Sequence, residues 1–178
     1  MIYFYCTYFY QNEENRKTLC FYCSMFEKIN LHTRMIDSNR PYRRTEIDKI
    51  FTKTKASMQQ AALIRGGDGI ALYIDVYTGK TLRGGDPYDY EHLRSSEAVH
   101  TQFKAVLTDE QIALVVNCPE NVAVTLRCIN QSKGKRRMED WLSNPANIVV
   151  NGIDLKLTLA NLKKADEGIE KTVREIRK

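Results

Sequence analysis

Residues 121–130 read Asn-Val-Ala-Val-Thr-Leu-Arg-Cys-Ile-Asn, and this stretch decides the fold that we expect. Residues 121–126 alternate in the manner of a half-buried strand. Residues 128–142 follow at once with the composition of a helix, whose polar face carries four basic residues. Those residues are Lys133, Lys135, Arg136 and Arg137. The stretch therefore predicts a strand that runs directly into a helix.

A second candidate strand lies upstream, where residues 88–93 read Tyr-Asp-Tyr-Glu-His-Leu. Between the two strands we expect helices over residues 96–107 and 108–116. Thr108 is the expected N-cap of the second helix, since acidic residues follow it in the first turn. The resulting order of strand, helical insertion, strand and helix predicts an α+β domain.

Two further elements are expected before this core. A helix should begin with Thr45 as its N-cap, because apolar residues then recur at three- and four-residue spacing. It should stop before Gly66, where a glycine cluster begins. Residues 70–77 are rich in β-branched and aromatic residues and predict a strand.

The sequence after the core predicts a hairpin and a helix. Asn151-Gly152 is a strong two-residue turn signal, so residues 148–157 are expected to form a hairpin. An amphipathic helix should follow from Leu159 to the C-terminus. The fold class expected is thus α+β, with flanking helices and a C-terminal hairpin plus helix.

The composition bounds the class of protein. With 178 residues and a net charge of +5, the chain is long enough for one domain and mildly favours polyanionic partners. No stretch reaches the roughly 20 apolar residues of a membrane span, and the opening does not resemble a secretory signal. We therefore expect a cytoplasmic protein with no membrane partner. The cysteines are odd in number and irregularly spaced, which argues against a disulfide framework.

The first part of the chain differs from the rest. Residues 1–34 are crowded with Tyr, Phe and Cys and show no clean period, so they predict an irregular N-terminal extension to one domain over residues 35–178. One hypothesis is that natural translation starts at Met35. Another alternative is a zinc site in this extension. Its ligands would be Cys6, Cys20, Cys23 and His32.

Three short segments carry the chemistry. They are Glu91-His92, then Asn121, then Asn130 with Lys133 three residues later. In this order they resemble the HNH nuclease family, in the variant that has Asn at the last metal-binding position. Residues 77–80, Tyr-Thr-Gly-Lys, also look like the turn that commonly precedes the family's acidic-His strand. The resemblance covers roughly residues 73–141 and implies a ββα-metal (His-Me finger) core.

The resemblance implies a role for each matched residue. His92 would be the general base that takes a proton from the attacking water. Glu91 and Asn130 would bind one divalent metal, Mg²⁺ or Mn²⁺, and Asn121 would brace the loop behind the base. The four basic residues of the helix would contact DNA phosphates. We therefore expect a DNA endonuclease in which the His92, Glu91 and Asn130 side chains converge.

The match departs from the family pattern at several positions. Glu91 stands where the family more often has Asp, so Asp89 could assist the metal, and residues 93–95 replace the usual Ile-x-Pro. The zinc-binding Cys pairs of many members are missing, and Cys118 and Cys128 are expected as small buried hydrophobes. Glu91 and the missing Pro support an alternative, a catalytically inactive nucleic-acid-binding or interaction module that keeps the HNH fold. Restriction, phage defence, mobile-element and toxin proteins all use this site.

Overall fold

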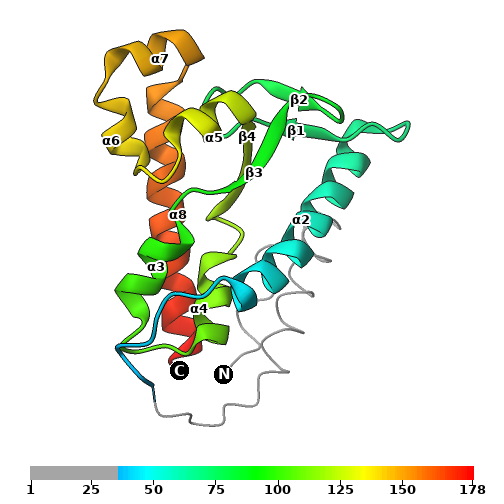
Figure 1. Cartoon of the computed structure of the whole chain (residues 1–178). Helices are drawn as coiled ribbons and strands as arrows, with labels where there is room; N and C mark the ends of the chain where they lie inside the picture. The colour runs from blue at the N-terminus through cyan, green and yellow to red at the C-terminus, as the bar shows by residue number, and fades with distance from the viewer. Residues whose placement is uncertain (1–35) are drawn as a thin grey trace. The chain divides into compact units, whose positions relative to one another are not determined.

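The computed structural model describes residues 36–178 (Figure 1). This part of the chain is mixed α+β with two small antiparallel sheets, which confirms the α+β class that the sequence predicted. The interpretations of residues 1–34, of Met35 as a start and of the alternative zinc site lie outside the described residues. No helix within residues 36–178 is long and apolar enough to cross a membrane.

The central sheet pairs the two strands on which the predicted motif depends. β3 (Tyr88–His92) runs antiparallel to β4 (Val122–Leu126), with Tyr88 opposite Leu126 and His92 opposite Val122. Both strands were predicted to within a residue. β4 passes directly into α5 (Arg127–Lys133), so the predicted strand-to-helix junction is also confirmed.

The second sheet is shorter than the sequence suggested. β1 (Leu72–Ile74) pairs with β2 (Thr81–Arg83), so the strand predicted over residues 70–77 is right only in part. Asp75 ends it, because one carboxylate oxygen accepts hydrogen bonds from the N–H groups of Tyr77 and Thr78 and turns the chain. The other oxygen accepts from Thr125 Oγ1 and from the N–H of Leu126, which joins the turn to β4.

Helices α3 (Ser96–Phe103) and α4 (Asp109–Val116) form the insertion between β3 and β4. Thr108 caps α4 as predicted, since its hydroxyl accepts from the N–H of Gln111 and the Gln111 side chain returns to the Thr108 N–H. The long helix before the sheets, α2 (Thr45–Gly66), ends within one residue of the predicted position. Its N-cap is Arg44, with no side-chain cap, so the prediction of Thr45 as the cap is wrong.

The C-terminal region is entirely helical. α6 (Met138–Leu142) is separated from α5 by Gly134, whose φ of 56° breaks the single helix predicted over residues 128–142. The predicted hairpin is wrong, because α7 (Pro145–Asn151) occupies its first half and Gly152 ends that helix in the left-handed region. α8 (Leu155–Ile176) includes the predicted C-terminal helix and begins earlier, at an Asp154 cap.

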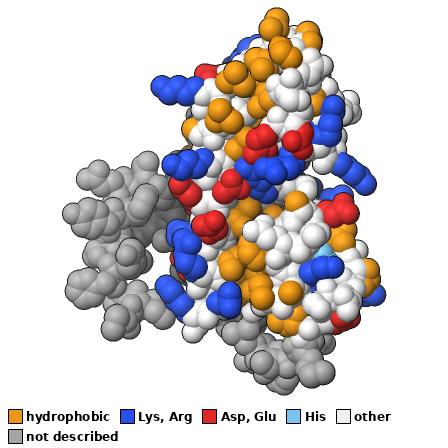
Figure 2. Space-filling model, turned by 90° about the vertical axis from the view of Figure 1, so that its left-hand side faces the viewer, with side chains coloured by type: hydrophobic (Ala, Val, Ile, Leu, Met, Phe, Trp, Pro, Cys, Tyr) orange, Lys and Arg blue, Asp and Glu red, His pale blue; other side chains and the backbone are white. Residues whose placement is uncertain are grey.

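Helices cover both faces of the β3–β4 pair (Figure 1). On one face, Met58 and Ala62 of α2 pack with Tyr90 and Val124. On the other, the core is built from α5, α6 and α8 and includes Trp141. Figure 2 shows hydrophobic side chains gathered at the end of the molecule that α7 forms, where Val149 and Val150 are 80% and 81% exposed.

Candidate functional site

The two faces of β3 present different side chains. Consecutive strand residues point to opposite sides, so Glu91 and His92 leave the strand in opposite directions. Asp89 and Glu91 face α5, as their contacts with Asn130 and Lys133 show. Tyr88, Tyr90 and His92 face α2, whose Phe51 contacts the His92 ring. The predicted residues of β3 are therefore divided between the two faces of the strand.

Glu91 forms a buried ion pair. Nζ of Lys133 lies 2.7 Å from Oε1 of Glu91, and the two side chains are 6% and 4% exposed. The buried hydroxyl of Tyr77 lies beside the same carboxylate. Burial raises the pKa of Glu91, and the Lys133 ammonium opposes that rise. The expectation that Lys133 faces DNA phosphates is not met, because its ammonium is buried against this carboxylate.

Asn130 lies on the same face as Glu91 but contacts a different carboxylate. Its Nδ2 donates to Oδ2 of Asp89 at 3.1 Å. Nε of Arg127 donates to the other Asp89 oxygen at 3.0 Å. The sequence suggested Asp89 only as an additional metal ligand. It is the carboxylate that contacts Asn130, the metal ligand predicted on α5.

His92 is held on the opposite face by two neighbours. Its Nε2 lies 2.9 Å from Oδ1 of Asn117, and its ring centroid lies 4.3 Å from that of Phe51. Burial lowers the pKa of His92, and the Asn117 contact partly opposes this. Neither Glu91 nor Asn130 is among these partners. The structure therefore brings Glu91 and Asn130 to one face and does not bring His92 to it.

Asn121 is fully buried and ties down the chain that follows His92. Its Oδ1 accepts from the N–H of Arg94 at 2.7 Å. Its Nδ2 donates to the carbonyl oxygens of Arg94 and Val116 at 3.1 and 2.8 Å. The backbone carbonyl of Asn121 also accepts from the N–H of Leu93 at 2.9 Å. These bonds lie directly behind the end of β3, at the place expected for a brace.

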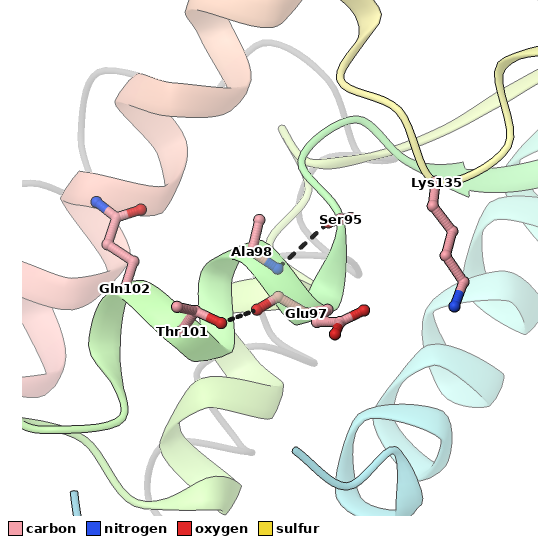
Figure 3. Close-up of a pocket in the computed structure, with 6 residues that line it drawn as sticks. All are labelled: Ser95, Glu97, Ala98, Thr101, Gln102 and Lys135. Carbon is pink, nitrogen blue, oxygen red and sulfur yellow. Dashed lines mark hydrogen bonds between the residues drawn. The ribbon is translucent and has the colours of Figure 1, made fainter. Parts of the chain in front are cut away.

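The remaining predicted basic residues lie at the surface after α5. Lys135 lines a shallow pocket of about 470 Å³ together with residues of the first turns of α3, and Figure 3 shows its side chain extended at the edge of that pocket. The other lining residues are Ser95, Glu97, Ala98, Thr101 and Gln102. Arg136 folds back onto the carbonyl oxygens of Ser132 and Lys133, and Arg137 approaches Glu139. All three are exposed, and Arg136 and Arg137 also contact neighbouring groups of the protein.

Sequence reasoning missed two buried residues of this region. Asn117 had no signal, because its link to His92 depends on how α4 packs against β3. Asp75 had one, since Asp three residues before Thr78-Gly79 is typical of a turn closed by a side chain. The prediction that Cys128 is buried is wrong, whereas Cys118 is buried as expected.

A metal here would depend on few protein ligands. Within residues 36–178 no three His, Cys, Asp or Glu side chains gather as a metal site. Glu91 and Asn130 would have to leave most coordination positions to water, which Mg²⁺ tolerates. Glu91 already has the Lys133 ammonium 2.7 Å from one oxygen, so a cation bound there would have to take the place of that ammonium.

Comparisons with known proteins bear on the whole chain. No family model, no curated protein and no solved structure matches it.

Proposed function

We propose that residues 36–178 form a metal-dependent endonuclease of the HNH type, which hydrolyses phosphodiester bonds in DNA. The pairing of β3 with β4, followed directly by α5, supports this most. It joins Glu91-His92 to the later stretch that carries Asn121 and Asn130, in one strand–strand–helix unit. In the proposal, this unit is the ββα-metal core.

The α5 face of this unit supplies the metal ligands. Glu91 would hold the cation through an oxygen that now lies beside the Lys133 ammonium, so binding would exchange one positive charge for another. Asn130 would add a second oxygen, and Asp89 is placed to assist because it already contacts Asn130. The metal would supply Lewis-acid stabilisation of the charge that develops on the leaving 3′ oxygen.

His92 would accept the proton of the attacking water. Its lowered pKa keeps the imidazole neutral near pH 7, as a base requires. It is the last residue of β3, so the substrate would have to approach it at the end of the strand, where pairing with β4 stops. Asn121 would hold the backbone beyond it through the bonds to Arg94.

A plasmid-nicking assay tests this function. Wild-type protein should nick supercoiled DNA with Mg²⁺ or Mn²⁺ and lose that activity in EDTA. His92→Ala should be slower by about 10²- to 10⁴-fold, the usual contribution of a general base. His100→Ala is the control, because His100 lies near Asp109 and away from the proposed ligands. Cleavage that survives both EDTA and His92→Ala contradicts the mechanism.

The second candidate is a DNA-binding module without catalysis. Two observations favour it: Lys133 already neutralises Glu91, and His92 is paired with Asn117 on the other face. Fluorescence anisotropy with labelled duplex DNA would separate the candidates. Binding that weakens with salt, without cleavage under Mg²⁺ or Mn²⁺, would establish the module and exclude the nuclease.

A further inference from the structure

The side chain of Asn117 connects three elements of the fold. It lies at the C-terminal end of α4, is fully buried, and reaches both α2 and β3. Its Nδ2 donates to the carbonyl oxygens of Ile47 and Ala113 at 3.1 and 2.8 Å. Its Oδ1 lies 2.9 Å from Nε2 of His92.

These contacts fix which end of the Asn117 amide faces His92. Backbone carbonyl oxygens only accept hydrogen bonds, so the end that faces Ile47 and Ala113 must be the NH₂ group. Exchanging the amide oxygen and nitrogen would place three acceptors together. The end that faces His92 is therefore the oxygen, which can only accept, and Nε2 of His92 must carry a hydrogen.

We propose that Asn117 is a positioning residue that holds His92 in the Nε2–H tautomer and leaves Nδ1 as its proton acceptor. Phe51 supports the same arrangement, since its ring packs on the imidazole and restricts its rotation. The catalytic consequence rests on the proposed nuclease function, in which Nδ1 would take the proton from water. The tautomer itself does not depend on that function.

Nitrogen NMR of the full ¹⁵N-labelled chain, at a pH above the histidine range, tests the tautomer directly. The His92 signals are identified by their loss in His92→Gln. In wild-type protein, Nε2 should give a protonated, pyrrole-type signal and Nδ1 an unprotonated, pyridine-type signal. A protonated Nδ1, or a mixture of both forms, would overturn the proposal whatever the variants do.

Two leucine variants then test the role of the amide. Asn117→Leu keeps the approximate shape but removes the acceptor, so His92 should become a mixture of tautomers. Asn147→Leu is the matched control, because Asn147 donates to the Trp141 carbonyl at 2.7 Å and lies in α7. It should leave the His92 signals unchanged. An unchanged tautomer in folded Asn117→Leu contradicts the proposal.

Cleavage kinetics separate this role from a structural one. Asn117→Leu should lower kcat by about 10- to 100-fold, as loss of a partner that orients an active imidazole does, with little change in KM for DNA. Asn147→Leu should change neither. A variant that loses only DNA affinity would overturn the positioning role. If wild-type protein shows the Nε2–H form but never cleaves DNA, the tautomer assignment is supported and the nuclease proposal is the one that fails.

Discussion

The two faces of β3 differ in what satisfies their side chains. On the α5 face, Asp89 and Glu91 depend on ionic partners, which are Arg127 and Lys133. On the α2 face, Tyr90 shares a 2.8 Å hydroxyl contact with Tyr73, and His92 has Asn117 and Phe51. One short strand thus carries a face held by ion pairs and a face held by hydroxyl, amide and aromatic contacts.

The largest expected effect breaks the ion pair on the α5 face. Lys133→Met would leave the Glu91 carboxylate buried without a compensating charge. Removing one partner of a buried pair costs about 3–5 kcal/mol of unfolding free energy. Urea unfolding of the variant and of wild-type protein measures this loss. Lys135→Met is the control, and it should change stability by less than about 0.5 kcal/mol because Lys135 is exposed.

The stability of Lys133→Met can also be measured with and without Mn²⁺. If Glu91 is a metal ligand, Mn²⁺ should recover part of the stability that Lys133→Met loses, because a ligand that binds only the folded state stabilises it. Glu91→Gln combined with Lys133→Met should show no such recovery. Equal stability of Lys133→Met with and without Mn²⁺ would mean that Lys133 is the permanent partner of Glu91.

Local sequence signals predicted most of the elements around this strand. β3, β4 and the Thr108 cap follow from alternation and from a capping pattern, both of which act within a few residues. The hairpin prediction failed because a left-handed glycine serves a helix end as well as a turn, and Gly152 does the former. Pro145 after Asn144 was the signal for that helix, since proline fits its first turn.

The family pattern predicted the elements that carry Glu91, His92 and Asn130. It did not predict that His92 points to the other face of the strand. The motif placed Glu91 and Asn130 on neighbouring elements, and the structure has them on one face. The predicted strand over residues 88–93 implied that His92 points away from Glu91, because consecutive strand residues point to opposite faces, whereas the family pattern does not state it. The partners Asn117 and Lys133 depend on packing between elements, which no local pattern encodes.

A smaller effect is expected from the aromatic contact on the α2 face. Phe51→Leu keeps apolar bulk but removes the ring that packs on His92, which should cost about 1 kcal/mol of unfolding free energy. Phe103→Leu is the control, because Phe103 is also partly buried and packs in a different cluster. Both variants should be destabilised in urea. Only Phe51→Leu should shift the NMR signals of the His92 ring, and an equal shift in both would contradict the contact.

The smallest expected effect is the response of this face to pH. Burial lowers the pKa of His92 and of His100 in the folded protein. Below about pH 6.5 the unfolded chain therefore binds a proton at each of these histidines more tightly than the folded protein does. Unfolding free energy should therefore fall as the pH drops from 6.5 toward the folded pKa values. His92→Gln should remove the contribution of His92 to that fall and leave the contribution of His100.

Cleavage should also decrease toward acid, because a protonated imidazole cannot accept a proton, but the decrease should begin below the ordinary histidine pKa. A rate that rises toward acid would exclude His92 as the base while leaving the buried pair on the other face unaffected.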